Sequence, residues 1–286
     1  MIRILPESES AQLLRRKSAR SEEAEAVVRP ILAAVRARGD EALRQYAREL
    51  DGFDRDTFVV PQSEIDRAVA ELPKNLRAAI ETASGNIRAF AERQKPAIWS
   101  TEITPCLRVG QLVRPLETIC AYIPAGRYPL VSTALMTVIP AQVAGVENIC
   151  LTTPKPSAAI LGAAGLLGGT NVFLLGGAHA IAAFAFGTET IPRAERIVGP
   201  GNIYVAAAKK LLAGEVGIDF IAGPTEIVII AEEGNASWIA ADMLAQAEHD
   251  VDASAILLTT SRTLAQEVAG EIERQLQSLA TAPVAR

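Results

Sequence analysis

The feature that most constrains the fold of this chain is a long run without charged side chains. Residues 156–188 contain no Asp, Glu, Lys or Arg, and a run of this length could span a bilayer. Glycine pairs at 168–169 and 176–177 cut the run into short pieces. Strands of a parallel sheet that is covered on both faces are continuously apolar, and so are the helices that cover them. The run therefore predicts the core of an α/β domain and not a membrane span.

The chain on both sides of this run alternates between short apolar strands and alanine-rich helices. This rhythm is typical of a doubly wound, mostly parallel sheet, and a second, shorter round of it begins after residue 225. The predicted strands cover residues 118–123, 148–152, 171–175, 196–198, 226–231 and 254–259. The predicted helices cover residues 132–144, 157–167, 178–186, 202–213, 237–249 and 262–279.

The two ends of the chain differ from this pattern. Residues 1–100 show helical apolar spacing and no chemical signature, so we expect a helical region that acts as a scaffold or a dimer contact. Residues 226–286 supply two strands and two helices, and a sheet of two strands leaves an apolar edge or face bare. We expect another subunit or a longer chain to complete this sheet.

Composition narrows the functional classes. The net charge is −5, and every Lys/Arg-rich stretch has acidic residues interspersed, which argues against a nucleic-acid partner. The first 26 residues become charged before an apolar core could form, unlike a signal peptide. The three cysteines show no CxxC spacing, which disfavours a disulfide framework or a thiolate zinc site. We therefore expect a cytoplasmic protein without a membrane partner.

Three glycine-bearing loops follow predicted strands, at residues 122–127, 176–179 and 199–202. In open α/β sheets, ligands bind beyond the carboxyl ends of the strands, and glycine lets the backbone approach a phosphate closely. None of the loops is GxGxxG, and each alone is typical of an ordinary turn. Their occurrence together favours a nucleotide or another phosphate-bearing ligand, and Asn202 can cap the helix behind the third loop.

Two further features carry polar side chains. Thr225 follows a Gly-Pro turn at the start of a predicted strand, where it either faces a ligand or bonds its own backbone. Asp242, Gln246 and His249 share one helical stripe, which either ligates a divalent metal or places His249 to complement the helix dipole. Because His179 is the one other histidine in the sequence, an all-histidine metal site is excluded.

Long segments of the chain resemble a known family. Residues 218–249 closely resemble the signature segment of the histidinol dehydrogenases. Residues 122–156 and 176–202 match the same family in order and spacing, and residues 35–43 are similar to its N-terminal helical region. The resemblance covers nearly the whole chain and is highly specific.

The resemblance implies an activity and an organisation. The family oxidises L-histidinol through an aldehyde to L-histidine in two NAD-dependent steps of histidine biosynthesis, with Zn²⁺ anchoring the substrate. It implies two Rossmann-like doubly wound domains after the helical region of residues 1–100. The first, at residues 101–225, would bind NAD, and the second would be incomplete at residues 226–286. It also implies a homodimer whose sites are shared between subunits.

The same resemblance assigns site residues, with one departure from the family pattern. The family has Gln where this chain has His179, and His can replace one of the two amide contacts. The implied NAD-site residues are Tyr122, His179 and Asn202, the implied substrate contacts are Thr225, Gln246 and His249, and the implied zinc ligands are Gln246 and His249.

No catalytic acid or base is assigned within the chain. The Glu-His pair that the family uses lies beyond the position of Arg286, so we expect the 286 residues alone to turn over poorly or not at all. Two alternatives stay open. The chain is an NAD- or metal-binding remnant without turnover, or it belongs to a dehydrogenase of another polar primary alcohol.

Overall fold

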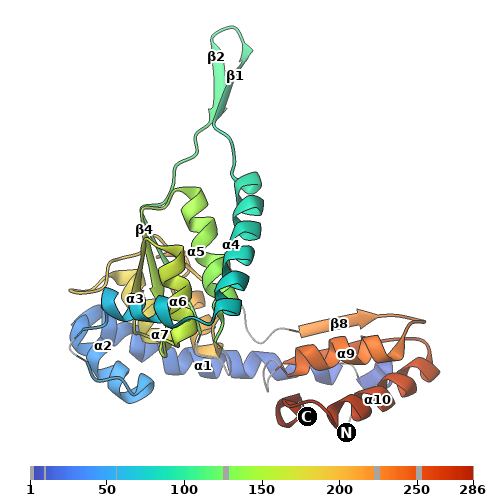
Figure 1. Cartoon of the computed structure of the whole chain (residues 1–286). Coiled ribbons are helices and arrows are strands. Elements are labelled where there is room, and N and C mark those ends of the chain that lie inside the picture. Colours follow the sequence, from blue (N-terminus) through green and yellow to red (C-terminus); the bar gives the residue numbers. More distant parts are fainter. Residues whose placement is uncertain are drawn as a thin grey trace. The chain divides into compact units, whose positions relative to one another are not determined.

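The computed structural model describes residues 3–9, 11–55, 57–124, 129–221, 226–248 and 253–285. The chain forms two compact units (Figure 1): one comprises Glu22–Ile221, and the other comprises Met1–Ser21 and Ala222–Arg286. Each unit has hydrophobic clusters of its own. Among the described residues, no helix combines the length and the apolar run that crossing a bilayer requires.

The larger unit is built on a five-stranded parallel sheet. Its order is β5-β4-β3-β6-β7, so the chain starts in the middle and winds outward in both directions, as the alternation of strands and helices predicted. All five residues of β3 are buried, as expected of a parallel sheet covered on both faces. The strands are β3 (Thr118–Tyr122), β4 (Asn148–Thr152), β5 (Thr170–Phe173), β6 (Arg196–Val198) and β7 (Gly217–Ile218).

Alternate residues of β3 face opposite helical layers. Ile119 and Ala121 share a cluster with α5 (Val131–Ala144) and α6 (Ala158–Leu167). Cys120 and Tyr122 share the other cluster, to which α7 (Gly177–Phe186) and α8 (Ile203–Leu212) contribute. The four helices therefore cover both faces of the sheet, and the charge-free run lies inside the protein.

The N-terminal helices from residue 22 onward belong to this unit and pack around its core. Helix α3 packs against α6, α4 packs against α5, and α2 packs against α7. The segment of residues 58–60 covers the outer edge of β5. Val60 N donates to Val172 O at 2.8 Å, and Leu174 N donates to Phe58 O at 2.7 Å. The elements of this region are η1 (Glu7–Glu9), α1 (Ala11–Arg38), α2 (Asp40–Tyr46), η2 (Ala47–Asp51), α3 (Gln62–Glu71) and α4 (Lys74–Gln94).

An antiparallel hairpin that the sequence analysis did not predict follows α4. It pairs β1 (Trp99–Thr104) with β2 (Leu107–Gln111), and it projects beyond the end of α4 (Figure 1). Every residue of both strands is exposed. Trp99, Val109 and Leu107 lie on one face of the hairpin, because Trp99 pairs with Gln111 and residues two apart share a face.

The smaller unit contains a two-stranded parallel sheet, β8 (Glu226–Ile230) and β9 (Ser254–Leu258), in the described residues. One face packs through Ile229 and Leu257 against helices α9 (Ala236–Ala247), α10 (Arg262–Leu276) and α11 (Ala282–Ala285). On the other face Val228 is 52% exposed, Ile230 80% and Leu258 50%. The predicted bare apolar face is therefore confirmed.

Candidate functional site

The candidate site lies at the carboxyl ends of the central strands. Strands β3 and β6 are neighbours, and they are the point at which the winding of the sheet changes direction. Ligands of doubly wound sheets bind in the crevice outside this point. Tyr122 ends β3, Gly199 follows β6, and Gly177 begins α7 after β5, so all three predicted loops start at this edge.

The side chain of Tyr122 connects two of these loops. Its hydroxyl oxygen accepts a hydrogen bond from Gly177 N at 3.1 Å, and the ring is buried. Burial raises the pKa of the Tyr122 phenol above its ordinary value. The phenol therefore stays protonated at neutral pH, and its role is to fix the loop that begins α7 against the end of β3.

Gly199 brings the third loop against the same strand. Its φ is +109°, and a Cβ at this position would lie 2.2 Å from Tyr122 O. Side chains rarely adopt this φ, and the nearest atoms belong to backbone that cannot move aside. The sequence therefore needs glycine here to bring the loops after β3 and β6 into direct contact.

Asn202 caps α8, which confirms the capping prediction. Its side-chain oxygen accepts hydrogen bonds from Tyr204 N at 3.1 Å and Val205 N at 3.0 Å. The residue is exposed at the start of the helix, where the backbone N–H groups carry a partial positive charge. This end of α8 therefore offers an environment that suits an anionic group.

His179 is fully buried and lies on the first turn of α7. Its Nε2 lies 3.0 Å from Asp51 Oδ2, and the same carboxylate oxygen accepts a hydrogen bond from Gly176 N at 2.9 Å. The ring also stacks on Tyr46, with centroids 6.0 Å apart. Asp51 was not predicted from the sequence, because its partners lie more than 120 residues away and no local pattern marks it.

Two buried polar atoms near the carboxyl end of the sheet have no hydrogen-bond partner among the described residues. They are His179 Nδ1 and Thr153 Oγ1, the latter directly after β4. Buried polar atoms normally find a partner in the protein, in water or in a ligand. Both atoms lie close to the strand-end loops that the sequence predicts to hold a ligand.

The other predicted site residues belong to the smaller unit or lie outside the described residues. Gln246 lies in the last turn of α9, whereas Thr225 and His249 lie outside the described residues. In the part of the chain that the structure describes, no group of three or more His, Cys, Asp or Glu side chains could hold a metal ion.

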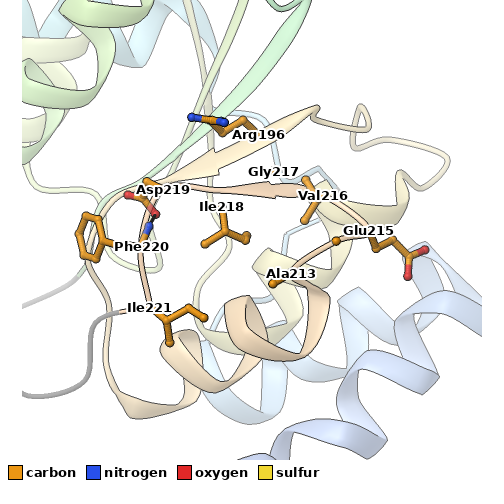
Figure 2. A pocket seen from close by; sticks show the side chains of 10 residues that line it. Arg196, Ala213, Glu215, Val216, Gly217, Ile218, Asp219, Phe220 and Ile221 are labelled. Carbon is orange, nitrogen blue, oxygen red and sulfur yellow. Dashed lines mark hydrogen bonds between the residues drawn. The ribbon is translucent and has the colours of Figure 1, made fainter.

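A cavity of about 540 Å³ borders the site along β7 (Figure 2). Asp219 and Phe220, on the segment that follows β7, contribute to its wall. Asp219 also accepts a hydrogen bond from Gly199 N at 2.7 Å, so this wall is joined to the loop after β6. The lining residues are Arg196, Ala213, Gly214, Glu215, Val216, Gly217, Ile218, Asp219, Phe220 and Ile221.

The cysteines lie apart from any nucleophilic arrangement. Cys120 and Cys150 are buried register partners on β3 and β4, and both are free thiols. Burial raises the pKa of Cys150 to about 12 and also raises the pKa of Cys120. Cys120 and Cys150 are therefore small core residues, while Cys106 is exposed in the hairpin turn.

The geometry defines an α/β protein whose candidate ligand site lies at the switch point of a doubly wound sheet. Comparison with known proteins makes this assignment specific. The family model described as "Histidinol dehydrogenase" matches residues 14–286. The chain therefore belongs to the histidinol dehydrogenase family.

Individual relatives agree with the family match. The chain is 45% identical over 288 residues to the histidinol dehydrogenase of Geobacter sulfurreducens, covering 98% of this chain and 67% of that protein. It is 48% identical over 266 residues to that of Thermus thermophilus, covering 92% and 63%. The crystal structure of histidinol dehydrogenase from Elizabethkingia anophelis matches with a TM-score of 0.87 at 38% identity, covering 98% and 66%. The chain thus spans about two thirds of the length of these relatives.

Proposed function

We propose that the chain acts in the NAD-dependent oxidation of L-histidinol, through the aldehyde, to L-histidine, with zinc anchoring the substrate. The observation that carries the proposal is the direct contact of three strand-end loops at the switch point of a chain that belongs to this family. The proposal places the reaction in the cytoplasm, where thiols such as those of Cys120 and Cys150 remain reduced.

In this proposal the larger unit holds NAD. Tyr122 and Gly199 set the spacing between the loops, and the start of α8 at Asn202 receives a phosphate. The Asn202 side-chain oxygen is engaged by the helix, so its amide nitrogen is the atom offered to the cofactor. His179 supports the NAD site from within the core, because the Asp51 carboxylate oxygen that its Nε2 contacts also holds Gly176 N at the start of α7. NAD, when bound, accepts the hydride from the alcohol carbon.

In this proposal the smaller unit supplies residues that bind the metal and the substrate. We assign Gln246 and His249 as zinc ligands that also contact substrate, and Thr225 as a substrate contact. A catalytic zinc takes three protein ligands, so these two residues form a partial set. No catalytic acid or base is assigned among the 286 residues, and the proposal uses none of them to remove the hydroxyl proton.

The experiment that tests the proposal separates binding from turnover. The purified chain is titrated with NAD⁺ by calorimetry, and NADH formation is then followed with L-histidinol and Zn²⁺. The intact Geobacter sulfurreducens enzyme is the positive control, and other polar amino alcohols serve as comparison substrates. We expect NAD⁺ binding, with turnover at least about 100-fold below the control because none of the 286 residues is assigned as the general acid or base. Absence of NAD⁺ binding would contradict the proposal. Turnover near that of the control would support the proposed activity and contradict the expected rate loss.

We also propose that the chain forms a homodimer through its hairpin. An isolated two-stranded hairpin is marginally stable in water, yet this one exposes Trp99, Leu107 and Val109 on one face. A second copy that covers this face would remove the apolar surface from water.

Replacing Trp99 and Val109 together by serine is expected to raise the dimer dissociation constant at least about tenfold, because aromatic anchors dominate interfaces. Light scattering across a dilution series measures this change. Arg108→Ser alters the opposite face of the hairpin and should leave the dimer intact. Equal dimerisation of the double variant and the unmodified chain would exclude the hairpin as the contact.

A further inference from the structure

A buried ion pair adjoins the loop after β6. Lys209 of α8 is 2% exposed, and its ammonium group donates to Asp219 Oδ1 and, at 2.9 Å, to Gly199 O. The Phe220 ring lies 4.9 Å from Lys209 Nζ and covers the pair. Lysine is almost never fully buried unless it is paired, so this position needs the carboxylate beside it.

The pair holds both backbone polar groups of a single residue. Asp219 Oδ2 accepts from Gly199 N at 2.7 Å, while Lys209 Nζ donates to Gly199 O. Asp219 Oδ1 also accepts from Phe220 N at 2.7 Å, which fixes the carboxylate on its own segment. The Asp219 carboxylate therefore binds the N–H of Gly199, and the Lys209 ammonium group binds its C=O.

We propose that Lys209 and Asp219 are positioning residues for the cofactor, an assignment that rests on the proposed function. Gly199 is held at a φ of +109° with its backbone against Tyr122, and the following residues lead into the Asn202 cap of α8. By fixing Gly199, the pair sets where the start of α8 stands relative to the end of β3. The loop is thereby pre-organised for NAD and loses little freedom when the cofactor binds.

Stability alone does not account for charges at this place. A well-packed apolar pair of similar volume commonly matches or exceeds a buried ion pair in stability. What an apolar pair cannot do is donate to Gly199 O and accept from Gly199 N. The distinctive contribution of the ion pair is therefore geometric, and it acts on the loop rather than on the core.

The test uses the double variant Lys209→Met/Asp219→Leu, which replaces the ion pair by an apolar pair. We expect it to fold, with a melting temperature lowered because the buried N–H and C=O of Gly199 lose their partners. Its Gly199 amide should exchange with solvent faster, and its NAD⁺ dissociation constant should rise about tenfold or more because the loop is no longer pre-organised. Calorimetry measures the affinity, and hydrogen exchange observed by NMR measures the amide.

Two further variants keep the test decisive. Lys210→Met removes the next lysine of α8, which pairs with Glu25 on the surface, and should change neither readout. If the double variant does not fold, Asp219→Asn replaces it. Its amide oxygen still accepts from Gly199 N, but without the charge it no longer holds Lys209 Nζ against Gly199 O, so we expect weaker NAD⁺ binding from it as well. A folded variant that binds NAD⁺ like the unmodified chain would overturn this inference alone. An unmodified chain that does not bind NAD⁺ would overturn the proposed function and this inference with it.

Discussion

Replacing Gly199 by alanine is expected to destabilise the larger unit by about 3 kcal/mol or more and to abolish NAD⁺ binding. The new Cβ would lie 2.2 Å from Tyr122 O, and the φ of +109° is strained for alanine. Because the clash is between backbone and Cβ, the loop after β6 must move away from β3 to relieve it. The change in free energy of unfolding is measured by urea denaturation at constant slope.

Gly214→Ala is the matched control for this prediction. Gly214 has a φ of +97°, close to that of Gly199, but nothing lies within 4 Å of its ideal Cβ. The Gly214→Ala variant should therefore lose only about 1–2 kcal/mol of stability, which is the cost of holding alanine at a positive φ. Equal losses in the two variants would show that the contact between Gly199 and Tyr122 does not constrain the loop.

Replacing Asp51 by alanine is the second large effect that we expect, about 3 kcal/mol of lost stability. The carboxylate accepts from Gly176 N and contacts His179 Nε2, and His179 Nδ1 already has no partner among the described residues. Leaving a buried donor unsatisfied costs about 1–3 kcal/mol, and this variant leaves two polar groups in that state. The loop that begins α7 should loosen, and NAD⁺ affinity should fall with it.

Asp54→Ala supplies the control for Asp51. Asp54 lies three residues away, and its side chain is 81% exposed in a long ion pair with Arg48. Exposed pairs of this kind contribute about 0–1 kcal/mol, so little change is expected. Thermal and urea unfolding of both variants measure the difference. A loss at Asp51 no larger than the loss at Asp54 would refute a structural role for the carboxylate.

Local sequence pattern was sufficient to predict four of the five strands of the central sheet. The strands at 148–152 and 196–198 coincide with β4 and β6, because continuous apolar runs bounded by glycine and polar residues are a local signal. The cap at Asn202 was equally local, since its partners lie two and three residues ahead. The meeting of the loops followed from the general rule for parallel strands.

The remaining features depend on contacts that are distant in sequence. Asp51 and its partner His179 are 128 positions apart. The Lys209–Asp219 pair was not predicted, because a lysine in a helix is normally expected to lie on the surface. Strand β7 spans only Gly217–Ile218, which is too short for periodicity to reveal. The hairpin did carry a signal, the alternation of Trp99, Thr101 and Ile103 before Pro105, but its polar content resembles a loop.

The central claim is that the loops after β3 and β6, together with the start of α7, hold NAD. It is tested most directly by titrating NAD⁺ into the isotope-labelled chain and mapping the backbone amide shifts. The account predicts saturable shifts concentrated at Ile123, Gly177 and Asn202. Shifts confined to other parts of the chain, or no saturable shifts at all, would contradict it.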